Sequence, residues 1–124
     1  MAVDLHLHST CSDGSLTPSE IVAAAASIGL SGIALTDHDT LEGLSEAAAV
    51  AQQHSIRFGG GTELSVLWKD QSMHMLVDVL DPAPGPLQDR MEELRVSRHQ
   101  RNEHIAVKLQ ELGLDISIEE VSEE

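Results

Sequence analysis

Short apolar runs alternate with segments of helical periodicity along the first part of the chain. Residues 2–6 and 33–36 form the first two runs, and each is expected to be a strand because it is short and ends at polar turn residues. Between them, Thr17, Pro18 and Glu20 suit the N-cap, the first helical position and a capping-box partner. Apolar residues then recur at helical spacing, so the pattern predicts strand, helix, strand.

The same alternation continues with a second helix and two further strands. Thr40 is expected to cap the helix, whose apolar face ends near His54. A third strand is predicted over residues 56–66, and a fourth over residues 73–80 after a polar turn at residues 69–72. Because this connection is short, the two strands are expected to form either a hairpin or a tight parallel step.

A long helix is predicted over residues 87–112, after a segment at 81–86 that is rich in proline. Gly113 is placed to end it, and residues 116–124 are expected to form a short strand or a new helix. The order strand-helix-strand-helix-strand-strand-helix indicates an α/β fold built on right-handed crossovers. Four strands are too few to close a barrel from this chain alone.

The composition narrows the class of protein. At 124 residues with 41% apolar content, the chain suits at most one domain with a real core. It has one cysteine, no long apolar run and no basic segment ahead of a signal-like stretch. These features predict no secretory signal, membrane span or disulfide framework, and hence a cytoplasmic location.

The charge is strongly negative, with 21 acidic and 7 basic residues and a formal net charge of −14. Such a surface repels duplex nucleic acid, and the two large aromatic residues, Phe58 and Trp68, offer little base stacking. A small phosphorylated substrate is not excluded, because bound divalent metals reverse the local field.

Candidate metal chemistry begins with His6 and His8, which are two residues apart on the first strand and therefore point to the same face. A turn then brings Asp13 back toward them, and two imidazoles with a carboxylate suit a divalent transition metal. The alternative is a pair of surface histidines at a strand end. Cys11 is either a further ligand or a simple loop residue.

Later strands add side chains of the same kind at their predicted ends, namely His38, Glu63 and His74. In parallel α/β folds these ends meet at one rim, where ligands gather. The set is too large for one tetrahedral zinc, so it predicts two or three metals. Asp37 either positions His38 as a hydrogen-bond acceptor or is a plain loop residue.

Two neighbouring features have simpler interpretations. Residues 59–61 are three glycines, but no P-loop lysine or helix follows them, so a strand bend that makes room for metals is favoured over a phosphate cradle. His54 is expected only to end its helix.

The motifs together resemble those of the PHP (polymerase and histidinol phosphatase) family. The resemblance is closest to its stand-alone branch, with nucleotide and 3′,5′-bisnucleotide phosphatase or short-RNA exonuclease activity. It implies the N-terminal part of a distorted (β/α)7 barrel with a long inserted helix: residues 1–124 form one incomplete domain, with a barrel half at 1–81 and a helical region at 82–124. The motifs are DLHLHS at 4–9, SDG at 12–14, TDHD at 36–39, GTELS at 61–65 and MHML at 73–76.

The resemblance also implies up to three Mn, Fe or Zn ions. By motif, His6 and His8 would hold the first ion, Glu63 would bridge the first and second, and His74 would bind the second. The family's chemistry is the hydrolysis of phosphate esters by a metal-activated hydroxide, without a side-chain nucleophile.

The third ion would be held by Asp13 and His38. The later histidine and the Asp-x-His motif that complete the family's site are absent after residue 80. The chain therefore resembles the first half of a PHP domain. The second and third ions would each keep only two protein ligands, and two ligands hold a metal weakly. An incomplete barrel with open strand edges is also expected to self-associate.

The predicted function is that of a metal-dependent phosphoesterase acting on phosphate monoesters of nucleotides or short oligonucleotides, with no membrane partner. The alternatives are a phosphatase of the histidinol-phosphate type and a catalytically inactive, truncated domain. Five of the seven basic residues fall in the long helix. Among them Arg98 and Arg101 suit phosphate binding, although a solvated face paired with neighbouring glutamates explains them as well.

Overall fold

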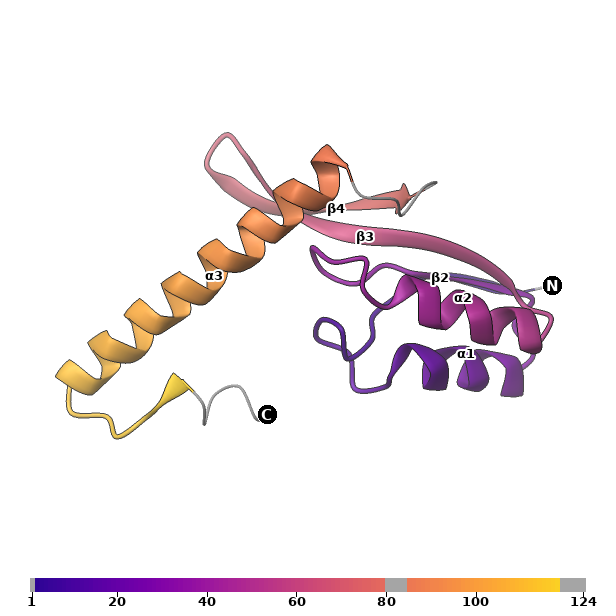
Figure 1. Ribbon diagram of the computed structural model, residues 1–124, viewed down its shortest axis with the longest axis horizontal. Helices are drawn as coiled ribbons and strands as arrows, with labels where there is room; N and C mark the ends of the chain where they lie inside the picture. The colour runs from indigo at the N-terminus through magenta and orange to yellow at the C-terminus, as the bar shows by residue number, and fades with distance from the viewer. Residues whose placement is uncertain (1, 80–84, 119–124) are drawn as a thin grey trace. The chain divides into compact units, whose positions relative to one another are not determined.

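The computed structural model describes residues 2–79 and 85–118 and divides into two units, Met1–Gln88 and Asp89–Glu124 (Figure 1). The predicted α/β order is confirmed, with all seven elements present. The elements are β1 (Val3–Leu7), α1 (Pro18–Ser27), β2 (Gly32–Leu35), α2 (Leu44–Gln53), β3 (Arg57–Trp68), β4 (Gln71–Val79) and α3 (Pro86–Glu111).

The four strands form one curved sheet in the order β1-β2-β3-β4. β1, β2 and β3 run parallel, whereas β3 and β4 are antiparallel, so the hairpin alternative is the correct one. Lys69 and Asp70 make the turn with φ angles of 47° and 64°. Two consecutive positive φ angles match the sharp turn that suits a twisted hairpin, and β4 therefore begins two residues earlier than predicted.

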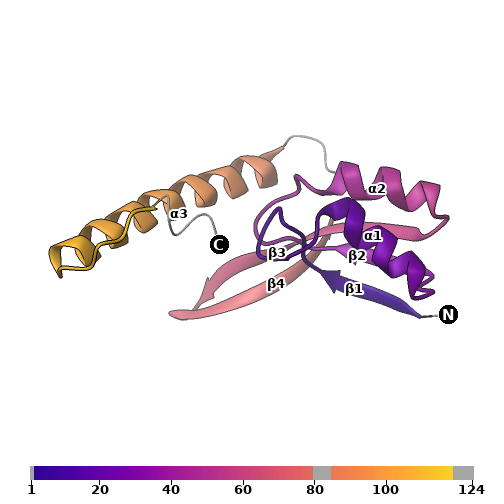
Figure 2. The same ribbon diagram turned by 90° about the horizontal axis from the view of Figure 1, so that it is seen from below.

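The core lies between the sheet and the two short helices. α1 and α2 pack against each other and cover one face of the sheet, as both views show (Figures 1 and 2). β2 is buried along its whole length, and Ile33 and Leu35 point from it into the helices. The core residues are Ile21, Val22, Ala25, Ile33, Leu35, Leu44, Ala47, Ala51 and Ile56.

The register of the strands decides which side chains face away from the helices. Phe58 on β3 lies beside Ile33 and packs on the core, so every second residue from it faces the helices, and Glu63 faces the opposite side. On β1 the register shifts between Asp4 and Leu7, and Leu7 packs on the core. His6 and His8, on either side of Leu7, therefore point to the same side of the sheet as Glu63.

The start of α1 matches the prediction, because Thr17 and Glu20 form a reciprocal capping box. The hydrogen bonds from the backbone and hydroxyl of Thr17 lower the pKa of Glu20. The start of α2 was predicted wrongly. Gly43, rather than Thr40, is its N-cap, because the Thr40 hydroxyl accepts a bond from the Glu42 amide (3.2 Å) within a preceding turn.

Two of the three consecutive glycines allow close packing around β3. A Cβ on Gly60 would lie 3.0 Å from Leu44 of α2, and one on Gly61 would lie 2.7 Å from the carbonyl oxygen of Val77 on β4. β3 runs through them without a break. Their small size therefore lets a helix and a neighbouring strand approach the sheet.

The second unit contains most of α3. Gly113, with a φ of 87°, ends this helix as predicted, and the Leu114 amide bonds the Leu109 carbonyl at 3.1 Å. The strand or helix predicted for residues 116–124 lies largely outside the described residues. Among the described helices, none has the length and apolarity needed to cross a membrane.

α1 and α2 end in the same backbone motif, built on different residues. After α1, Gly29 takes a φ of 80°, and the Leu30 amide bonds the Ala25 carbonyl at 3.0 Å. After α2 the equivalent bonds form around Ser55, whose φ is 56°. A left-handed conformation is free of steric cost for glycine but costs an L-residue about 1–2 kcal/mol.

We therefore expect Ser55→Gly to stabilise the chain by about 1 kcal/mol, because it removes that cost at the end of α2. The matched change, Gly29→Ser, should destabilise it by a similar amount, since the space around Gly29 is open and only the backbone conformation opposes a side chain. Urea unfolding followed by circular dichroism measures both. A loss of stability in Ser55→Gly would contradict the assignment.

Candidate metal centre

Glu63 occupies the middle of the site and is held there by backbone pairing. β2 ends at Leu35, but an isolated parallel bridge joins His38 to Glu63 beyond it. The Glu63 amide donates to the Asp37 carbonyl (3.1 Å), and the Asp39 amide donates to the Glu63 carbonyl (3.2 Å). The glutamate is 7% exposed, so its carboxylate is presented from a fixed and buried position.

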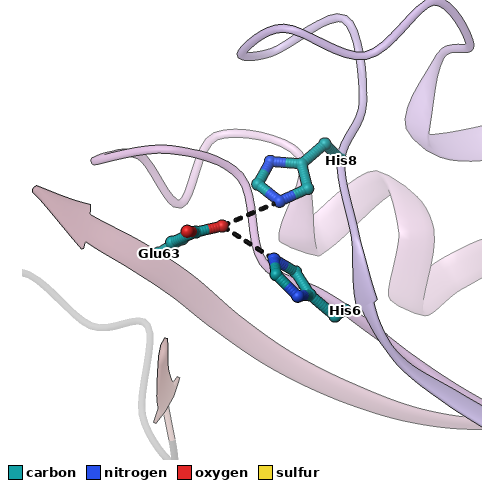
Figure 3. Close-up of side chains that lie close together, drawn as sticks. All are labelled: His6, His8 and Glu63. Atoms are coloured by element: carbon teal, nitrogen blue, oxygen red, sulfur yellow. Dashed lines mark hydrogen bonds and ion pairs between the residues drawn. The ribbon is translucent and has the colours of Figure 1, made fainter. Parts of the chain in front are cut away.

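Imidazole nitrogens face both oxygens of the Glu63 carboxylate. Oε2 lies 2.7 Å from Nε2 of His6 and 3.0 Å from Nε2 of His8, and both rings point at it (Figure 3). Oε1 lies 2.9 Å from Nδ1 of His74. A carboxylate on a buried strand needs such partners, and here three histidines provide them.

Asp13 and His38 form the other side of the same cluster. Nδ1 of His8 lies 3.3 Å from one oxygen of Asp13, and Nε2 of His38 lies 3.6 Å from the other. Nε2 of His38 is also 3.9 Å from Oε2 of Glu63. The structure thus brings all the metal-ligand candidates of the sequence together, in three overlapping groups: His6–His8–Glu63, His8–Asp13–His38 and His38–Glu63–His74.

His74 reaches the cluster by a route that the sequence did not predict. It was expected at the C-terminal end of a strand, on the same rim as the others. Instead β4 runs antiparallel to β3, and His74 lies within it, opposite Ser65. Because Ser65 is two residues beyond Glu63, His74 faces the same side and contacts Glu63 diagonally across the hairpin.

The loop after β1 is tightly wound, and this turns Asp13 toward the histidines. The Ser9 carbonyl accepts hydrogen bonds from the amides of Ser12 (3.0 Å) and Gly14 (2.9 Å). A Cβ on Gly14 would lie 2.1 Å from the carbonyl oxygen of His8. Only glycine fits this approach, so Gly14 is required for the loop to fold back.

Asp37 fits neither of its two sequence-based interpretations. Its carboxylate is 1% exposed and accepts bonds from the amide and hydroxyl of Ser9 (2.6 and 2.7 Å) and from the Ser12 hydroxyl (2.6 Å). It therefore holds the loop after β1 rather than a histidine. Ser9 and Ser12 were missed as structural partners, and only their closeness in sequence to His8 and Asp13 marked them.

Asp39 was also missed. It is buried, takes a positive φ of 50°, and accepts a hydrogen bond from the Ser65 amide at 2.9 Å. Together with the Thr62 hydroxyl, which donates to the Asp37 carbonyl at 2.8 Å, it ties the end of β2 to both sides of Glu63. A positive φ at aspartate is tolerated but uncommon, and no local sequence pattern predicted it here.

The electrostatics favour an ionised carboxylate at the centre. The hydrogen bond from His6 lowers the pKa of Glu63, burial opposes this, and the positive charges of His38, His6 and His74 lower it further. Glu63 is therefore an anion at neutral pH.

The residues present fit divalent transition metals. The four imidazoles follow one another with ring centroids 5.0, 4.6 and 4.8 Å apart, so protonating all of them would place like charges in contact. Within the described part of the chain, Nδ1 of His8 is buried and makes no hydrogen bond, because its 3.3 Å approach to Asp13 lacks hydrogen-bond geometry. Neutral imidazole nitrogens beside two carboxylates form the donor set that Mn²⁺, Fe²⁺ or Zn²⁺ prefers.

The PHP domain model matches residues 4–123 of the chain. The chain belongs to the PHP domain family. Its PHP domain is 39% identical over 112 residues to a 3′,5′-nucleoside bisphosphate phosphatase of Chromobacterium violaceum, covering 90% of this chain and 39% of that protein. It is 34% identical over 111 residues to a 5′-3′ exoribonuclease of Haemophilus influenzae, covering 90% and 40%.

Solved structures agree with this fold. A Bifidobacterium adolescentis protein, provisionally described as a metal-dependent phosphoesterase, superposes with a TM-score of 0.88 at 31% identity, covering 96% of this chain and 41% of that one. The predicted fold class, an α/β fold that forms the N-terminal part of a PHP barrel, is confirmed. The chain spans about two-fifths of the length of the relatives it matches.

Cys11 and His54 belong to none of the three groups found among the described residues. Cys11 is half-buried in the loop after β1, where its amide donates to the Ser9 hydroxyl at 3.1 Å. His54 is the C-cap of α2, as expected. Arg98 and Arg101 lie on α3, and their role in phosphate binding stays a prediction.

We expect Gly14→Ala to weaken Mn²⁺ binding about 10- to 100-fold, because the loop must move away from His8 and take Asp13 with it. Calorimetric titration measures the affinity. Gly59→Ala is the matched control, since its Cβ would meet Ala34 at an ordinary 3.5 Å. Equal affinity in Gly14→Ala and the parent chain would show that the close approach does not shape the site.

The lowered pKa of Glu63 predicts an acid-dependent contribution to stability of the metal-free chain. The stability that ionised Glu63 contributes is fully present above its ordinary pKa of 4.5. It is lost as the pH falls through the lower pKa that Glu63 has in the folded chain. Glu63→Gln should therefore flatten the stability profile below about pH 4.5. Urea unfolding from pH 3 to 7 tests this, and an unchanged slope in the variant would contradict it.

Proposed function

We propose that this chain provides the metal-binding part of a phosphoesterase that hydrolyses phosphate monoesters of nucleotides or short oligonucleotides. The observation that carries the proposal is the convergence of four histidines and two carboxylates in three overlapping groups, two of which contain Glu63. The named relatives are a nucleoside bisphosphate phosphatase and an exoribonuclease, which favours nucleotides over a histidinol-phosphate type of substrate.

The proposed ligands follow the three groups. His6 and His8 would hold one ion, Glu63 would serve this ion and a second one at His74, and Asp13 and His38 would hold a third beside His8. Mn, Fe and Zn all suit these donors. When bound, such ions activate water for attack on phosphorus and neutralise the charge that develops on the phosphate.

The protein's own residues decide how substrate reaches these ions. The side chains of His6 and His74 are each 50% exposed, and that of Asp13 is 68% exposed. The buried Glu63 carboxylate thus lies under a ring of partly exposed donors, which leaves one side open to a phosphate group. Phosphate approaches a chain of net charge −14, so its binding depends on the ions.

Further parts of the proposal concern partners and location. Arg98 and Arg101 would bind substrate phosphate, a role suited to guanidinium groups. β1 and the β3–β4 hairpin carry exposed apolar side chains, including Leu5 (60% exposed) and Leu67 (78%), which favours self-association of the partial barrel. We place the protein in the cytoplasm, without a membrane or duplex nucleic acid as partner.

The activity is tested by phosphate release from a nucleoside 3′,5′-bisphosphate, AMP and histidinol phosphate, with Mn²⁺ added to the purified chain. We expect release from the nucleotides, and a loss of at least about 100-fold in Glu63→Gln because the shared carboxylate is removed. His54→Ala is the matched control, since this histidine ends α2 away from the site. A phosphatase activity that survives Glu63→Gln, or no release from any nucleotide, would refute the proposal for this chain.

A further inference from the structure

Asp37 has a buried carboxylate whose hydrogen-bond donors, among the described residues, come from one loop. Its carboxylate accepts three short bonds, from the Ser9 amide (2.6 Å), the Ser9 hydroxyl (2.7 Å) and the Ser12 hydroxyl (2.6 Å). Burying a carboxylate is costly unless charge-assisted hydrogen bonds satisfy it, so these contacts hold the loop strongly. Asp37 belongs to none of the ligand groups found among the described residues.

The backbone of Asp37 is fixed just as firmly on the other side. Its carbonyl accepts bonds from the Glu63 amide (3.1 Å) and from the Thr62 hydroxyl (2.8 Å). The side chain therefore binds the loop after β1, while the main chain binds β3. Asp37 thus joins the loop that carries Asp13 to the strand that carries Glu63.

The loop needs this support because its ligand is exposed. The Asp13 side chain is 68% exposed yet must lie between His8 and His38, at 3.3 and 3.6 Å. The Ser12 hydroxyl lies 2.6 Å from Asp37 and 3.4 Å from Asp13, directly between the two carboxylates. The short bond to Asp37 thus fixes the residue next to Asp13.

We infer that Asp37 is a positioning residue, which acts through Ser9 and Ser12 to hold Asp13 and His8 in place for the ion they share with His38. Glu63 and His74 meet across the β3–β4 hairpin and do not depend on this loop. The inference deepens the proposed function, because it concerns the same site. It describes the metal-free protein, so its test does not require hydrolysis.

The test compares metal-free Asp37→Asn and Ser12→Ala with the parent chain by NMR at one pH. In Asp37→Asn the Ser9 amide should exchange its hydrogen about tenfold faster, because a neutral acceptor binds it less strongly. The ring signals of His8 and His38 should shift in both variants, while those of His74, whose ring centroid lies 4.8 Å from that of His38, should shift less. Ser15→Ala is the control, since this exposed serine of the same loop is not among the donors to Asp37.

A purely structural role would lower stability without this selectivity. The inference is overturned if the His8 and His38 signals of both variants match the parent, or if the His74 signals shift as much as theirs. Should Asp37→Asn fail to fold, Ser12→Ala decides alone, since it removes one hydroxyl and no charge. If the two variants show the selective shifts but the parent chain with Mn²⁺ releases no phosphate, the proposed function is refuted and this inference stands.

Discussion

Two backbone hydrogen bonds between residues 37–39 and Glu63 are the constraint on which the site depends. They continue the pairing of β2 with β3 beyond Leu35, where the regular strand has ended. Because of them His38 lies beside Glu63, and the Asp37 side chain faces the loop that carries Asp13. His6, His8 and His74 each contact the Glu63 carboxylate, and His38 brings in Asp13, so the arrangement of the cluster rests on main-chain geometry.

The charge balance of the cluster ties folding to ion binding. Without metal, the Glu63 anion is satisfied by histidines, and the hydrogen bond from His6 lowers its pKa. A bound cation would take over that role, because metal ligation uses imidazole nitrogens that carry no proton. Four of the seven histidines of this acidic chain gather in the cluster, which suits the binding of a cation there.

Local chemistry explains why much of this could be predicted from the sequence. The capping box at Thr17 and the strand that carries His6 and His8 need only a few neighbouring residues, and both were predicted correctly. The route of His74 was not, because a short connection permits either strand direction until the Lys69–Asp70 turn is known. The hydrogen bond that the Ser9 amide donates to Asp37 joins residues 28 apart in sequence, and no spacing rule reveals such a contact.

The ligands therefore differ in how they are supported. Glu63 and His74 are carried by paired strands, and His6 lies in the bulge of β1, where few rearrangements are open to them. Asp13 lies on a loop whose shape depends on Gly14 and on the buried Asp37 carboxylate. Since preorganised ligands lose less freedom on binding, ions at the strand-borne groups should bind first and those at the loop-borne group last. With the proposed ligands, the fold would therefore set the order in which the ions bind.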